Sequence, residues 1–233
     1  MAIILHIETA TDICSVALSQ KEEILCFKTV PEANLHSAKL TLFIDEIMHQ
    51  AGLEYSDLDA VSVSMGPGSF TGLRIGVAVA KGICFGLNKP LIGVSTLQAL
   101  VVAALRENKL TNELICSLID ARNNEVYYAL YNEKFNELIQ PDIGQFNQTD
   151  INSFLDNKII FVGDGVLKWT ADFRNHPNAI IQENMLTDAR NLVPLALRKY
   201  NLQEFEEIAS FEPYYLRDFK AKKGFKIKKI LNI

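Results

Sequence analysis

The chain has 233 residues, of which 48% are hydrophobic and 22% are charged, and its formal net charge is −5. This composition is typical of a globular protein with its own core, and it excludes a disordered or low-complexity chain. Seven basic residues follow residue 216, which leaves the rest of the chain with 16 basic and 27 acidic residues. An acidic body of this kind argues against nucleic-acid binding across the whole surface. RNA contact through the basic C-terminal segment stays open.

Cellular location and metal binding can also be judged from composition. No apolar run approaches the ~20 residues that cross a bilayer, and the first residues indicate a buried strand rather than a signal peptide. The four cysteines form no C-x-x-C pair, so we expect reduced thiols in a cytoplasmic protein without membrane contact. The four histidines form no cluster with metal-ligand spacing, and no G-x-S-x-G motif is present. The sequence therefore predicts neither a metal site nor catalytic residues.

Hydrophobic patterning predicts an alternating order of strands and helices. In chain order, the first part has strands over 3–8, 15–19 and 24–30, a helix over 37–51, a strand over 60–64, a helix over 71–85, a strand over 91–94 and a helix over 96–106. The second part has strands over 114–119, 125–131 and 159–162 and a helix over 191–200. This order is typical of an α/β fold with a mixed sheet. Both parts begin with strands that end in acid-containing turns, at 8–11 and 120–123, which indicates two lobes of related topology with a cleft between them.

The stretch over 65–76, Met-Gly-Pro-Gly-Ser-Phe-Thr-Gly-Leu-Arg-Ile-Gly, lies between a predicted strand and a predicted helix. Strand, glycine loop and helix in this order can present backbone N–H groups to an anion. The loop nevertheless matches neither the dinucleotide fingerprint nor the Walker A pattern, in which Leu73 would take the place of the lysine. A tight loop is predicted, but its chemistry stays open.

Small residues recur every four positions in the helix after this loop, at Gly72, Gly76 and Ala80. A glycine inside a helix costs about 1 kcal/mol relative to alanine. We therefore expect something to approach this backbone closely, either the chain's own sheet or a helix of a partner. The helix over 37–51 would extend such a partner face with its apolar residues, which are Leu40, Phe43, Ile44, Ile47 and Met48.

Polar residues at two strand ends are candidates for a nucleotide or phosphate site. Glu8, Thr9 and Thr11 follow the first buried strand, at the edge where open α/β sheets bind ligands. They could hold a phosphate or a hydrated Mg²⁺, or they could form an ordinary polar turn. The tripeptide Gly163, Asp164 and Gly165 follows a later strand and is a turn or a site of close approach to a nucleotide.

The sequence resembles the TsaB (YeaZ) family of bacterial tRNA threonylcarbamoyladenosine biosynthesis proteins. Several motifs carry this resemblance nearly from end to end. They are Ile-Glu-Thr-Ala-Thr over 7–11, His-Ser over 36–37, Gly-Pro-Gly-Ser-Phe-Thr-Gly-Leu-Arg-Ile-Gly over 66–76, Gly-Val-Ser-Thr-Leu over 93–97, Ile-Asp-Ala-Arg over 119–122 and Pro-Tyr-Tyr-Leu-Arg over 213–217.

The resemblance implies an actin/Hsp70/sugar-kinase type of fold with two lobes, the second one reduced. The first lobe would comprise residues 1–106, joined by the C-terminal segment 209–233, and the second lobe residues 107–208. It also implies a non-catalytic scaffold that dimerises with the catalytic TsaD-type paralog for threonylcarbamoyl transfer to adenosine 37 of ANN-decoding tRNAs. Further implied partners are a TsaE-type ATPase subunit, a second copy of the chain, and tRNA reached through the complex.

The resemblance predicts an absence as well. The metal-binding histidines of the catalytic paralog would fall on Thr96 and Leu100, and neither side chain can hold a catalytic metal at that spacing. No cofactor is predicted with certainty, although ATP or ADP could lie at the interface of the complex. The alternatives are an ATP-binding ATPase or kinase of the same fold, an inactive metalloprotease-like regulator, and an RNA-binding module that uses the basic C-terminal segment.

Overall fold

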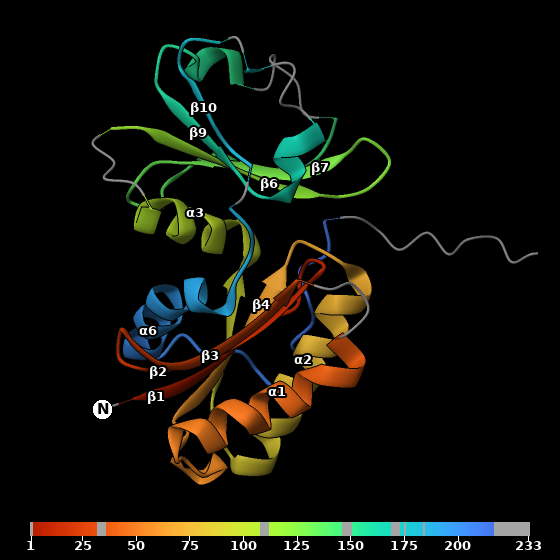
Figure 1. The fold of residues 1–233 in the computed structure, drawn as a ribbon, viewed down its shortest axis with the longest axis vertical. Helices are drawn as coiled ribbons and strands as arrows, with labels where there is room; N and C mark the ends of the chain where they lie inside the picture. Colours follow the sequence, from red (N-terminus) through yellow and green to blue (C-terminus); the bar gives the residue numbers. More distant parts are fainter. Residues whose placement is uncertain are drawn as a thin grey trace, which may run out of the picture.

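The computed structural model describes residues 2–31, 36–107, 112–145, 151–168, 173–174, 176–183 and 185–216. The basic C-terminal segment begins after these ranges, so the RNA-contact alternative lies outside the described residues. Figure 1 shows two sheets stacked along the long axis of the molecule. We call each sheet with the helices packed on it a lobe.

Each lobe is built on a five-stranded mixed sheet. The first sheet has the order β3-β2-β1-β4-β5, and its strands are β1 (Ile3–Glu8), β2 (Ile13–Gln20), β3 (Glu23–Pro31), β4 (Ala60–Gly66) and β5 (Leu91–Ser95). The second has the order β10-β9-β6-β7-β8, and its strands are β6 (Leu114–Asp120), β7 (Val126–Tyr131), β8 (Glu137–Gly144), β9 (Ile159–Val162) and β10 (Ala179–Gln182).

The two sheets repeat one topology. In each, the first three strands in chain order form an antiparallel meander, and the fourth and fifth add in parallel on the other side of the first strand. Two lobes of related topology were predicted from the two acid-containing turns, and the strand orders confirm this. The expected actin/Hsp70/sugar-kinase type of fold, with mixed sheets flanked by helices, is confirmed as well.

Helices cover both faces of the first sheet. On one face α1 (His36–Ala51) and α2 (Phe70–Leu87) lie side by side over the main hydrophobic core (Figure 1). On the other face lies α6 (Val193–Leu202), while α3 (Thr96–Glu107) packs between the two sheets. Four short 3₁₀ helices complete the described elements: η1 (Tyr55–Asp57), η2 (Asn152–Phe154), η3 (Asp164–Lys168) and η4 (Ala189–Leu192).

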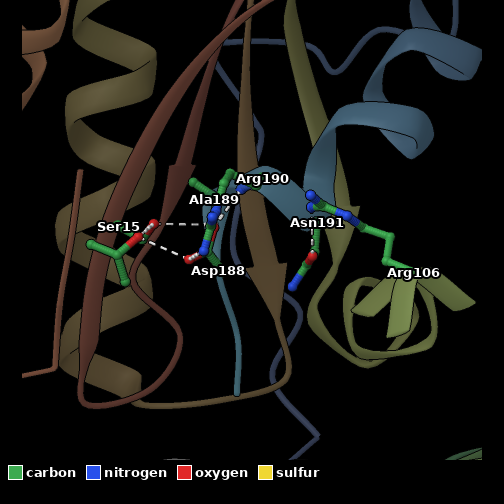
Figure 2. Close-up of polar contacts among 7 residues, drawn as sticks. Ser15, Arg106, Asp188, Ala189, Arg190 and Asn191 are labelled. Atoms are coloured by element: carbon green, nitrogen blue, oxygen red, sulfur yellow. Dashed lines mark hydrogen bonds and ion pairs between the residues drawn. The ribbon is translucent and has the colours of Figure 1, made fainter. Parts of the chain in front are cut away.

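The chain returns to the first lobe earlier than we predicted. The boundary was placed at residue 209, but α6 packs against β5 and the residues just before it bind the first sheet. Figure 2 shows part of this contact: the Ala189 amide donates to Ser15 Oγ at 3.1 Å, and Arg106 donates to Asn191 Oδ1 at 3.4 Å. Asp188 accepts hydrogen bonds from the Arg190 side chain (2.8 Å) and from the Thr29 hydroxyl (2.8 Å). These polar contacts place the return at about residue 188, and a hydrophobic pattern cannot predict them.

Most predicted elements are present within one to three residues of their expected bounds. Two strands were not predicted, β8 and β10. Both lie at edges of the second sheet and are only partly buried, so their sequences lack the apolar alternation of a central strand. Pro141 lies within β8, a position that proline takes at a sheet edge because it has no N–H to donate.

Candidate functional site

The glycine loop packs against the turn that follows β1. The Ser69 amide donates to the Ala10 carbonyl at 2.6 Å. A Cβ on Gly68 would lie 2.3 Å from that same carbonyl oxygen, and a Cβ on Gly72 would lie 2.1 Å from the Thr9 carbonyl oxygen. Cβ atoms do not approach backbone oxygens this closely, so both positions require glycine. The glycine loop, which follows β4, is tight because it packs directly against the turn that follows β1.

The next small residue of α2 faces the same turn. Thr9 Oγ1 donates to the Gly72 carbonyl at 2.8 Å, and a Cβ on Gly76 would lie 2.2 Å from this Oγ1. Ala80 is fully buried in the core below. Of the two readings left open, close approach by the chain's own sheet explains these residues.

The residues predicted to form the partner face are not exposed to a partner. The eight residues assigned to it are all buried within this chain: Leu40, Phe43, Ile44, Ile47, Met48, Gly72, Gly76 and Ala80. The five residues from α1 form the main core together with β1, β2 and β4. The amphipathic period of α1 orients these side chains toward the sheet. Any partner of these helices must contact their opposite sides.

The opposite side of α2 is unusually open. Its exposed positions share one face of the helix and are mostly small or apolar. They are Thr71, Arg74, Ala78, Gly82, Phe85 and Gly86. The Phe85 side chain is 80% exposed, and a Cβ on Gly82 or Gly86 would meet no atom within 4 Å in the described part of the chain. Neighbouring α1 adds Leu42, which is 49% exposed. We call these exposed positions of α2 the open face.

The length and apolar composition of α2 would by themselves suit a membrane span, and 33% of the helix is buried in this structure. One such helix is weak evidence for a membrane, because core helices pass the same test. Here α2 packs along β4 and α1. Its incomplete burial instead leaves apolar surface exposed, and contiguous exposed apolar surface is characteristic of interaction sites.

The candidates for a phosphate site are brought together in part. Burial, and after it the nearby carboxylates of Asp188 and of Asp164, raise the pKa of Glu8, so Glu8 of the first lobe lies near Asp164 of the second. The hydroxyls beside them are occupied, because Thr9 donates to Gly72 and Thr11 is bonded to Thr187 at 2.7 Å.

The tripeptide after β9 is also fixed by packing. A Cβ on Gly163, whose φ is +105°, would lie 2.1 Å from the Leu118 carbonyl oxygen. A Cβ on Gly165 would lie 2.9 Å from the same peptide. Asp164 Oδ1 accepts a hydrogen bond from the Asp120 amide at 2.9 Å, and burial raises the pKa of its carboxyl.

The acidic side chains of this region bear on whether it can bind a phosphate. Carboxylates that lie near one another repel a phosphate unless a cation lies between them. Within the described ranges, no group of three or more histidine, cysteine or acidic side chains is arranged to hold a metal ion. ATP or ADP at these residues stays a prediction.

Two buried titratable groups lie on β1. His6 is fully buried, with Nδ1 2.7 Å from Ser62 Oγ and Nε2 2.8 Å from Ser19 Oγ, and burial lowers its pKa to about 3. Glu8 Oε1 accepts from the Ala10 amide at 2.6 Å and from the Ser64 hydroxyl at 3.1 Å, while its Oε2 has no hydrogen-bond partner among the described residues. Burial raises the pKa of Glu8 to about 7, against these hydrogen bonds.

The raised pKa of Glu8 predicts that removal of its charge increases the stability of the protein, and that the increase depends on pH. The folded protein binds the Glu8 proton more tightly than the unfolded chain does. Protonation of Glu8 therefore contributes stability that is fully present below pH 4.5 and is lost as the pH rises through 7. We expect Glu8→Gln to raise the free energy of unfolding by about 3 kcal/mol at pH 8, at 1.36 kcal/mol per pKa unit, and to leave it nearly unchanged at pH 4. Urea unfolding of variant and wild type at both values measures this.

Comparison at equal pH is needed because His6 acts in the opposite direction. Its folded pKa is depressed, so the unfolded chain gains a proton below pH 6.5 that the folded chain does not, and stability falls as the pH drops toward 3. That contribution is common to both proteins and cancels in their difference. An equal gain for Glu8→Gln at pH 4 and pH 8 would contradict a raised Glu8 pKa.

Comparison with known proteins places this geometry in a family. The family model of TsaD, tRNA N6-adenosine threonylcarbamoyltransferase, matches residues 29–225. The tRNA threonylcarbamoyladenosine biosynthesis protein TsaB of Escherichia coli K12 is 31% identical over 92% of this chain and 94% of that protein. YeaZ from Pseudomonas aeruginosa has a TM-score of 0.83 at 27% identity and covers 93% of this chain and 100% of its own.

A shorter match relates the chain to a catalytic relative. A tRNA N6-adenosine threonylcarbamoyltransferase of Jannaschia sp. is 45% identical over 86 residues, which are 36% of this chain and 24% of that enzyme. The match to TsaB proteins instead extends over nearly the whole length of both chains. The chain therefore belongs to the TsaB (YeaZ) family of tRNA threonylcarbamoyladenosine biosynthesis proteins.

Proposed function

We propose that this protein is the non-catalytic scaffold subunit that dimerises with the catalytic TsaD-type paralog. Together they would support threonylcarbamoyl transfer to adenosine 37 of ANN-decoding tRNAs in the cytoplasm. A TsaE-type ATPase would join the pair, and tRNA would be reached through the complex. ATP or ADP, where required, would bind at the interface of that complex rather than in this chain alone.

The open face of α2 is the observation that carries this proposal. An exposed aromatic ring of the size of Phe85 gains about 1.5–3 kcal/mol when a partner buries it. At the neighbouring positions Gly82 and Gly86 an added Cβ would meet no atom of the described residues within 4 Å, so another helix could approach the backbone of α2 closely. Contact between a small-residue face and a helix of a related fold would explain why the helix keeps glycines that its own packing does not need. In the absence of the paralog, the same face would support a homodimer.

The positions that correspond to the paralog's metal ligands support a scaffold rather than an enzyme. Thr96 and Leu100 lie on α3 and are fully buried. The Leu100 side chain packs against Gly163, where an added Cβ would come within 2.9 Å of Leu100 Cδ1. Apolar packing therefore fills the place that the resemblance gives to metal ligands.

Complex formation between purified proteins tests the proposal. We expect this chain and the TsaD-type paralog of the same organism to elute together in gel filtration, with a light-scattering mass equal to one copy of each. Separate elution at micromolar concentrations, with and without ATP, would contradict it. A homodimer that persists unchanged in the presence of the paralog would contradict it equally.

A further inference from the structure

A groove of about 420 Å³ runs beside the open face, between α2 and the chain segment over 211–215. Four residues of α2, one turn apart, line one wall: Arg74, Val77, Ala78 and Lys81. The other wall consists of Phe211, Glu212, Pro213 and Tyr215. The lining therefore combines apolar side chains with the charged side chains of Arg74, Lys81 and Glu212.

The second wall is firmly attached to the first lobe. The Lys81 ammonium donates to the carbonyls of Ala209 (3.2 Å) and Phe211 (3.0 Å). The Tyr214 amide donates to the Met65 carbonyl at 2.7 Å, and the Tyr214 carbonyl oxygen would lie 2.6 Å from a Cβ on Gly66, whose φ is +116°. These contacts attach the segment over 209–214 to α2 and to the end of β4.

Arg74 is held in position at one end of this groove. Its guanidinium carbon lies 4.0 Å from the centre of the Phe70 ring and 6.0 Å from that of Tyr215, and its Nε donates to Tyr215 Oη at 3.1 Å. Within the described part of the chain, its two terminal amino groups have no hydrogen-bond acceptor. A guanidinium fixed in this way can bind a carboxylate through two parallel hydrogen bonds at little entropic cost.

We propose that this groove receives a carboxylate-bearing segment of the catalytic paralog, with the carboxylate on Arg74 and an adjacent apolar side chain against Val77, Phe211 and Pro213. The inference rests on the proposed function, because Arg74 and Ala78 belong both to the open face and to the groove, so a partner that covers one also covers the other. It adds the chemistry of the partner, which is an aspartate, a glutamate or a chain terminus.

Charge decides between the candidate occupants. Among the lining residues, the cations of Arg74 and Lys81 outnumber the carboxylate of Glu212, which favours an anionic segment. The chain's own segment after residue 216 starts close to Tyr215, but it carries seven basic residues and one acidic residue and would be repelled. A partner carboxylate is therefore the occupant that the groove favours.

Substitution of Arg74 tests the inference in the full-length chain. Loss of two charge-assisted hydrogen bonds should weaken affinity for the paralog at least about 10-fold in Arg74→Ala. Arg74→Lys should not restore it, because lysine keeps the charge but lacks the planar fork. Arg198→Ala is the matched control, since Arg198 is also exposed but lies on α6, at the other face of the sheet. It should stay within 2-fold of wild type.

The outcomes separate this inference from the function beneath it. A wild-type complex whose affinity is unchanged in both Arg74 variants would overturn the groove proposal and leave the scaffold role intact. No complex with wild type would overturn the scaffold role itself. Loss of the homodimer in Arg74→Ala, with unchanged affinity for the paralog, would make a second copy the occupant and would also overturn the inference. Equal melting temperatures of Arg74→Lys and wild type would rule out misfolding as the cause of weak binding.

Discussion

Gly72→Ala should lower the free energy of unfolding by about 3 kcal/mol or more, or prevent folding outright. The added methyl group would lie 2.1 Å from the Thr9 carbonyl oxygen. Backbone on both sides cannot yield locally, because Thr9 Oγ1 donates to the Gly72 carbonyl and β1 lies at the centre of the first sheet. The turn after β1 would have to separate from the first turn of α2. Urea unfolding at pH 7 measures the loss.

Gly82→Ala in the same helix is the control for this prediction. Its Cβ would meet nothing within 4 Å, so the change should raise stability by up to about 1 kcal/mol through helix propensity alone. Equal effects at the two positions would show that the glycines of α2 reflect a general property of the helix rather than contact with Thr9. An unchanged stability in Gly72→Ala would contradict the packing described for the glycine loop.

Gly82→Trp should abolish binding to the TsaD-type paralog, weakening it by about 100-fold or more, which corresponds to about 3 kcal/mol. The indole ring would project from the centre of the open face and would keep α2 apart from a helix of the paralog. Folding should be unaffected, because the position is open in the monomer. The variant should therefore keep its cooperative unfolding transition while it elutes separately from the paralog.

The matched control for this variant is Asn201→Trp. Asn201 is exposed near the end of α6, on the opposite face of the first sheet. The same bulky side chain there should leave affinity for the paralog within 2-fold of wild type. A Gly82→Trp protein that binds as tightly as wild type would exclude the open face as the contact surface.

The fold could be predicted largely from sequence because its central strands and long helices have strong hydrophobic periods. The strands β1, β4 and β9 and the helices α1 and α2 lie close to their predicted bounds. What sequence could not supply was the set of polar contacts that place α6 on the first lobe. Hydroxyl and carboxylate pairs such as Thr29 with Asp188 join residues far apart in the chain and leave no periodic trace.

The surface was harder to predict than the fold. The regular spacing of Gly72, Gly76 and Ala80 drew attention to one side of α2, which is the side that faces Thr9 and the core. The exposed side differs from it by two positions and is marked by Gly82 and by the bare ring of Phe85. A phenylalanine among small residues at the solvent side was the signal available in sequence. It could be interpreted only once the helix had been oriented on its sheet.

If the proposed function holds, this TsaB-family protein is required for threonylcarbamoyladenosine formation through its contact with the paralog. Depletion of the protein, followed by nucleoside analysis of bulk tRNA, tests it most directly. We predict that threonylcarbamoyladenosine falls toward zero, that wild type and Asn201→Trp restore it, and that Gly82→Trp does not. Normal levels of the nucleoside after depletion would contradict the account.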